Sequence, residues 1–126
     1  MIDHVSIAVR DLDGCGRFYD AVLTTLGHVR LVTRPGTIGF GKKYPEFWLN
    51  ERRAMTPVDA DTGTHICFRT ASTEAVDAFH AAALHAGGRS DGAPGPRQAT
   101  LGAYYAAFIR DPEGNKIEAA TFLTQP

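Results

Sequence analysis

The stretch that decides the fold is Tyr104–Phe122, which reads YYAAFIRDPEGNKIEAATF. It consists of two apolar runs joined by Asp111–Asn115, and this join has the composition of a turn. Pro112 presets φ at the first corner, Gly114 tolerates positive φ, and Asp111 can bond its own backbone two residues further on. The stretch therefore predicts a β-hairpin with a loop slightly longer than the tightest kind.

The returning strand of this hairpin carries one carboxylate, Glu118, among small and apolar neighbours. Side chains alternate along a strand, so Glu118 and Ala120 share one face. A buried carboxylate needs a cation or a hydrogen-bond donor, because burying it unpaired is costly. A metal ion is one candidate for that partner, and an ion pair with Arg69 or Arg110 is another.

The composition is typical of a single globular domain. The chain has 126 residues, of which 44% are hydrophobic and 21% charged, with a formal net charge of -1. We expect no nucleic-acid or membrane partner, because there is no basic run and no apolar run near about 18 residues. No signal peptide is visible, and Cys15 and Cys67 form no CxxC motif. These features favour free thiols and a cytoplasmic location.

The order of expected elements is the same in the two halves. Residues 4–9 alternate as a strand and precede an apolar helix over about 14–26 that Gly27 closes. After a polar linker at about 51–63, His65 starts a second strand, and Ser72 caps a second helix over 75–86. The remaining expected elements are strands at 29–33, 37–41 and 47–49, a Gly/Pro-rich loop at 92–97, and the terminal hairpin.

An offset of 61 residues aligns the first strand and helix of the two halves without a gap, which two copies of one unit explain best. The matched pairs are His4 with His65, Phe18 with Phe79, Leu23 with Leu84 and Gly27 with Gly88. The sequence thus predicts one α+β domain, 1–126. It would consist of two tandem βαβββ modules, about 1–50 and 64–126, that form a curved mixed sheet around a cavity, with the helices outside.

The repeat places His4 and His65 at the same position of each first strand. If both point into the cavity together with Glu118, two imidazoles and one carboxylate make a three-ligand metal site with open positions. Trp48 is the counterpart of Glu118 in the first module and cannot ligate, so water or substrate would complete the shell. We expect the substrate to contact Trp48, Phe40, Phe108 and Arg97, the last as a clamp for a carboxylate or phosphate, and Tyr105 rather than Tyr104 to face the cavity.

The chain carries four motifs in order: the first strand with His4, the helix with the residues FYD at 18–20, GxHIxF at 63–68 and DPEGNKIE at 111–118. The order of these motifs along the chain resembles that of the vicinal oxygen chelate superfamily. That group includes glyoxalase I, extradiol dioxygenases, and the fosfomycin- and bleomycin-resistance proteins. The resemblance implies paired βαβββ modules, a homodimer, and a divalent metal held by His4, His65 and Glu118. Where glyoxalase I has a second glutamate, this chain has Trp48.

The expected function is that of a glyoxalase-like lyase or isomerase, dependent on Zn, Ni, Mn, Co or Fe, acting on a small molecule that chelates the ion through adjacent oxygens. The base would be metal-bound water, Glu118 if it dissociates from the ion, or Tyr105. Two alternatives stay open: an extradiol dioxygenase, and a binding protein that sequesters a drug or metabolite without turnover.

Overall fold

The computed structural model describes residues 1–100 and 102–122, so Leu101 and residues 123–126 of the predicted second module lie outside the described part. The two helices begin and end 61 residues apart (12 + 61 = 73; 24 + 61 = 85), as the repeat predicts. The elements are β1 (Val5–Val9), α1 (Leu12–Thr24), β2 (Val29–Arg34), β3 (Thr37–Gly41), β4 (Phe47–Glu51), β5 (Ile66–Arg69), α2 (Thr73–His85), β6 (Arg89–Ala99), β7 (Gly102–Arg110) and β8 (Lys116–Phe122).

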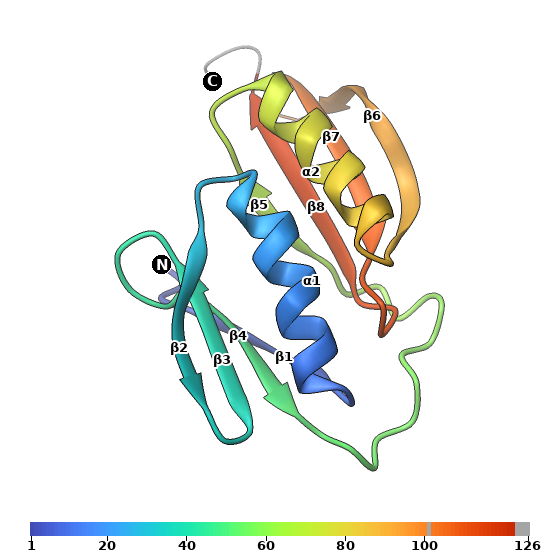
Figure 1. The fold of residues 1–126 in the computed structure, drawn as a ribbon. Coiled ribbons are helices and arrows are strands. Elements are labelled where there is room, and N and C mark those ends of the chain that lie inside the picture. The colour runs from blue at the N-terminus through green and yellow to red at the C-terminus, as the bar shows by residue number, and fades with distance from the viewer. Residues whose placement is uncertain (101, 123–126) are drawn as a thin grey trace.

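The strands form two four-stranded sheets with the orders β1-β4-β3-β2 and β5-β8-β7-β6. In each sheet the first strand pairs in parallel with the last, and the other pairs are antiparallel. Both helices lie on the same side of the sheets, and residues 52–65 connect β4 to β5 without a helix or strand (Figure 1). The prediction of an α+β fold with two βαβββ modules is confirmed.

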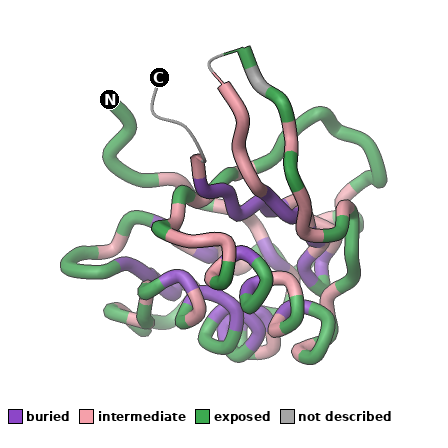
Figure 2. The backbone as a smooth tube through the Cα atoms, turned by 90° about the horizontal axis from the view of Figure 1, so that it is seen from above, coloured by how far each residue is buried: buried purple, intermediate pink, exposed green. Residues whose placement is uncertain are grey.

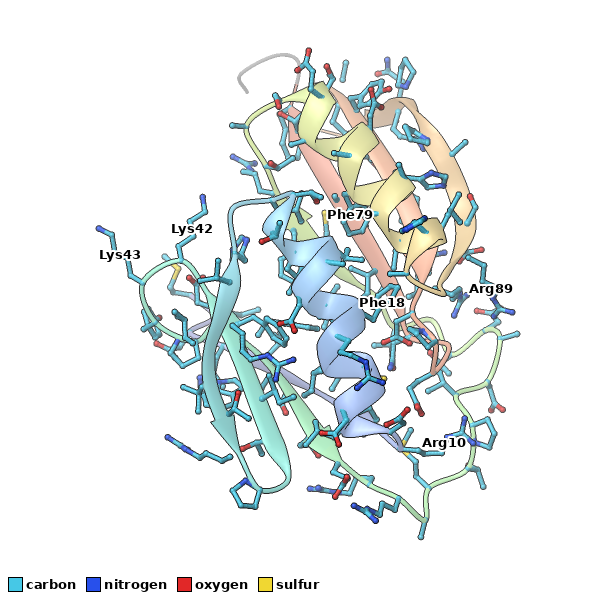
Figure 3. All side chains as sticks on the ribbon, in the orientation of Figure 1. Arg10, Phe18, Lys42, Lys43, Phe79 and Arg89 are labelled. Carbon is cyan, nitrogen blue, oxygen red and sulfur yellow. The ribbon has the colours of Figure 1, made fainter. Side chains whose placement is uncertain are left out.

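The helices start at side-chain caps and pack against each other. Asp11 accepts a hydrogen bond from the backbone N–H of Gly14, and Ser72 accepts one from Ala75. Phe18 and Phe79, labelled on the two helices in Figure 3, belong to one hydrophobic core shared by both modules. The buried backbone runs through the middle of the molecule, whereas the loops at its edges are exposed (Figure 2). Among the described residues, no helix is long and apolar enough to cross a membrane.

The prediction of a loop at 92–97 is wrong, because this segment belongs to the edge strand β6. Its pairing with β7 shifts register between Ser90 and Gly92 and again between Gly92 and Gly95. Proline is tolerated on an edge strand, since one side of that strand needs no N–H donor. The glycines and prolines that indicate a loop therefore mark an irregular, protected sheet edge.

The turn between β7 and β8 holds the first module through two carboxylates. The Glu113 carboxylate accepts hydrogen bonds from the backbone N–H and the Nε of Arg10, each at 3.0 Å, and from the N–H of Asp11 at 3.2 Å. The Asp111 carboxylate accepts a hydrogen bond of 2.6 Å from the Tyr19 hydroxyl of α1. Arg10 lies beside this turn in Figure 3. The second module thus supplies the acceptors for the two residues that precede α1 and for the buried tyrosine of that helix.

The two carboxylates of the turn differ in their electrostatics. Burial raises the pKa of Asp111 above its ordinary value, even though Tyr19 and Asn115 donate hydrogen bonds to it. Burial acts the same way on Glu113, but the donors of Arg10 and Asp11 outweigh it and lower the pKa of Glu113. Glu113 is therefore the carboxylate whose ionised form stabilises the fold.

We predict that Glu113→Gln lowers the free energy of unfolding by about 2 kcal/mol at neutral pH, because charge-assisted hydrogen bonds are lost. Since the folded pKa of Glu113 is lowered, its stabilisation is present above the ordinary value of 4.5 and is lost as the pH falls through the folded value. Urea unfolding between pH 7 and pH 3 should therefore show the gap between wild type and variant closing in acid. Asp59→Asn, in the exposed linker, is the control, and a variant as stable as wild type at pH 7 would contradict the prediction.

Candidate functional site

The buried carboxylate of β8 is paired with a histidine of the neighbouring strand. Nε2 of His65 lies 3.0 Å from Oε1 of Glu118, whose residue is only 5% exposed. Of the two arginines that the sequence leaves open as partners, Arg110 binds Asp91 and Arg69 stacks on an aromatic ring. The structure therefore brings two of the three predicted metal ligands together.

The third predicted ligand, His4, is exposed and precedes β1. Its Nδ1 lies 2.7 Å from Oδ1 of Asp3, and the hydrogen bonds from His4 and Tyr44 lower the pKa of Asp3. His4 and His65 nevertheless line the same open hollow of about 380 Å³. This hollow lies between the modules, since its walls are residues 2–5 and 46–47 of the first and residues 65–68 of the second.

The side chains fit a divalent metal ion in part. Within residues 1–100 and 102–122, no three His, Cys, Asp or Glu side chains are gathered closely enough to hold an ion. Imidazole and carboxylate are suitable donors for a divalent ion. Nε2 of His65 and Oε1 of Glu118 lie 3.0 Å apart, as in a hydrogen bond, whereas two donors about 2.1 Å from an ion in tetrahedral geometry lie about 3.4 Å apart. A small widening of this contact would admit an ion, and His4 is a further donor on the same hollow.

The face of the second sheet that points away from the helices, here called the distal face, carries Glu118. Ile109, Ile117 and Ala119 belong to the core under the helices, so the alternate residues lie on the distal face. The strand pairing sets Phe108 opposite Glu118, Tyr104 opposite Phe122, and Arg97 opposite Tyr104. The members of the distal face that matter here are His65, Cys67, Arg69, Arg97, Tyr104, Ala106, Phe108, Glu118, Ala120 and Phe122.

Two predicted substrate contacts, Phe108 and Arg97, are therefore on the same face as Glu118. The ring centroid of Phe108 lies 5.9 Å from that of His65. The guanidinium carbon of Arg97 lies 6.0 Å from the Phe108 ring, and its Nη2 donates to the carbonyl of Ala93. Arg97 thus lies on the β6 edge of the distal face rather than in a loop.

The prediction that Tyr105 faces the cavity is wrong. Its hydroxyl donates a hydrogen bond of 2.7 Å to Asp77 of α2, which places it on the helix side of the sheet. Tyr104 lies on the distal face instead, stacked on Phe122 at 5.6 Å between ring centroids. Burial, followed by the Glu118 carboxylate and Cys67, raises the pKa of Tyr104. Tyr104, and not Tyr105, therefore shares the distal face with Glu118.

The prediction that Phe40 lines the cavity is also wrong, because Phe40 is fully buried and its ring lies near those of Tyr19 and Phe47. Trp48 lies against Gly39, where an added Cβ would come within 2.9 Å of the indole. Glycine at position 39 thus leaves the space that the Trp48 ring fills. Trp48 belongs to the first sheet, whereas the residue of β4 that lines the hollow between the modules is Phe47.

Two further members of the distal face, Arg69 and Cys67, were not among the predicted site residues. The guanidinium carbon of Arg69 lies 4.3 Å from the centroid of Phe122. Cys67, a free thiol, pairs in register with Glu118, and desolvation followed by that carboxylate raises the pKa of Cys67 to about 12. Alternation from His65 was the available signal, since residues 65, 67 and 69 must share one face.

A family model for the Glyoxalase/Bleomycin resistance protein/Dioxygenase superfamily matches residues 1–119. No curated protein matches the chain. The crystal structure of a glyoxalase/bleomycin resistance protein from Albidiferax ferrireducens T118 is similar, with 35% identity and a TM-score of 0.85 over 94% of this chain and 97% of that one. A putative glyoxalase from Bacillus halodurans has 26% identity and a TM-score of 0.69, with coverage of 96% and 95%. The chain belongs to the Glyoxalase/Bleomycin resistance protein/Dioxygenase superfamily.

Proposed function

We propose that this chain is a metal-dependent enzyme of the glyoxalase-like lyase or isomerase type, acting on a small molecule with adjacent oxygen atoms. The contact between His65 and Glu118 carries the proposal, because it sets two suitable donors close to the separation that one ion can bridge. His4, on the same hollow, would be the third ligand after leaving Asp3. When bound, the ion would supply Lewis-acid stabilisation of negative charge on a substrate oxygen.

The proposed proton acceptor is Glu118. Its Oε1 faces His65, with which it would hold the ion, and its Oε2 would take a proton from the substrate. Phe108 lies opposite Glu118 in the strand pairing and limits the access of water on that side. Tyr105 has no place in this scheme, since its hydroxyl is bonded to Asp77. The hydroxyl group of Tyr104, which lies on the distal face, would orient the substrate instead.

The second candidate is a binding protein that sequesters a small molecule without turnover. It is favoured by the lack of a three-donor cluster in the described part of the chain and by the aromatic side chains of the distal face. Metal content separates the two candidates: tight ligand binding by protein that retains no divalent ion supports sequestration. Oxygen consumption with catechols would instead identify an extradiol dioxygenase.

The proposal includes a cytoplasmic homodimer, which is supported by the family resemblance. Sedimentation velocity tests the assembly, and a monomer at micromolar concentration would contradict it.

We predict that purified wild type binds about one divalent ion per chain and that His65→Ala weakens this binding by at least tenfold, because one of two adjacent donors is lost. His4→Ala should also weaken it. Equilibrium dialysis followed by elemental analysis measures the effect, and circular dichroism confirms that the variants fold.

The matched control is His85→Ala, since His85 is exposed at the end of α2 and lies in neither the hollow nor the distal face. Undiminished metal binding by His65→Ala would refute the proposed ligand set.

A further inference from the structure

Cys67 shares the distal face with both members of the His65–Glu118 contact. Ile66 and Phe68, its neighbours in the chain, pack against the hydrophobic core, so Cys67 points to the opposite side. It follows His65 by two residues, which places their Cα atoms about 6.6 Å apart along an extended chain. It is also the register partner of Glu118 in the parallel pairing of β5 with β8, where adjacent strands lie about 4.8 Å apart. The three side chains therefore start from one small area of the sheet.

The thiol of Cys67 is open to an external ligand. Cys67 is an exposed, free cysteine, and its Sγ makes a long contact of 3.9 Å with the backbone carbonyl of Phe68. At this length the contact is weak, so little is lost when the thiol turns toward a better partner. Cys67 also lines the hollow between the modules together with His4 and His65. One opening therefore presents a sulfur atom and two imidazole rings.

The charges around this hollow suit a cation. Asp3 and Glu46 belong to its lining, which includes no lysine or arginine among the described residues. Glu118 adds a further carboxylate beside His65. The cations at neighbouring positions of the second sheet have other partners: Lys116 and Arg110 share the Asp91 carboxylate, and Arg69 lies over the ring of Phe122. A divalent ion would therefore meet an acidic opening.

The contact between His65 and Glu118 needs a further donor to hold an ion, since no group of three donors is gathered within residues 1–100 and 102–122. His4 belongs to the other module and is bonded to Asp3. Cys67 lies on the same strand face as His65, so its thiol could reach the pair by rotation about one side-chain torsion. Thiolate, imidazole and carboxylate are all ligands of zinc. The second module can therefore supply three donors without any movement between the modules.

We propose that Cys67 is a metal ligand beside His65 and Glu118, and that its sulfur makes the site selective for zinc-like ions over Mn²⁺. On binding, the thiol proton passes to solvent and a sulfur electron pair forms the bond to the ion. Imidazole and carboxylate still bind Mn²⁺, but a thiolate is a soft donor that favours zinc. Cys67 would take the position that Trp48 cannot supply, and an ion that expands its coordination beyond four still leaves a place for substrate.

This inference rests on the proposed function, because it adds a donor to the same site and narrows the choice of metal. Titration with Co²⁺ tests it on full-length protein stripped of metal by a chelator, in thiol-free buffer. A bond between cobalt and a thiolate gives a charge-transfer band in the near ultraviolet, which nitrogen and oxygen ligands do not give. Wild type should show this band. Cys67→Ser should lose it and bind Zn²⁺ about tenfold more weakly, with affinity for Mn²⁺ changed by less than about twofold.

The matched control is Cys15→Ala, which removes the other thiol, buried in α1, and should keep the band. Circular dichroism confirms that both variants fold. A cobalt-loaded wild type without the band, a band that persists in Cys67→Ser, or an unchanged preference for Zn²⁺ over Mn²⁺ in that variant would overturn the proposal.

The effect of His65→Ala on Co²⁺ affinity keeps the two hypotheses apart. If the band is absent but His65→Ala still weakens Co²⁺ binding, only the assignment of Cys67 fails. If His65→Ala leaves the affinity unchanged, the ligand set of the proposed function fails. Wild type that binds no Co²⁺ would refute both.

Discussion

The Glu113 carboxylate lies at the N-terminal end of α1, where it accepts hydrogen bonds from the backbone N–H of the N-cap Asp11 and from the backbone N–H and side chain of Arg10 before it. It belongs to the turn of the second module, as does Asp111, which binds the core hydroxyl of Tyr19. These contacts fix the helix of one module to the hairpin of the other. The modules consequently share one core, and the starts of β1 and β5 border a single hollow.

The duplicated architecture serves different purposes in its two halves. The position that carries Glu118 in the second module carries Trp48 in the first, where the indole fills the space beside Gly39. Both sheets have arginines over aromatic rings, but the buried carboxylate that meets a histidine belongs to the second sheet alone among the described strands. The repeated fold is therefore asymmetric at this position.

Local patterns predicted the elements that depend on local chemistry. The Asp111–Asn115 turn and the cap at Ser72 follow from residues adjacent in sequence, and the 61-residue repeat predicted matching helices. The β6 strand was missed because its glycines and prolines are typical of a loop, and only the position at the sheet edge makes them compatible with a strand.

The candidate site was predicted only in part, because faces and rotamers depend on tertiary contacts. Pairing across the hairpin aligns Phe108 with Glu118, so Tyr104 and not Tyr105 shares their face. Phe40 faces the core, since the hydrophobic face of β3 packs under α1. The hydrogen bond between His4 and Asp3 depends on the rotamers of the two side chains, which the periodicity of the sequence does not predict. The meeting of His65 and Glu118, 53 residues apart, was expected from the repeat and the family resemblance and not from sequence spacing.

The most direct test of the account is a nuclear magnetic resonance titration of histidine-labelled protein with substoichiometric Mn²⁺. The chain has five histidines, so each ring is an independent reporter of its distance from a bound paramagnetic ion. We expect the ring signals of His4 and His65 to broaden together, while those of His80 and His85 on α2 stay sharp. Broadening confined to α2, or unchanged signals for His65, would contradict it.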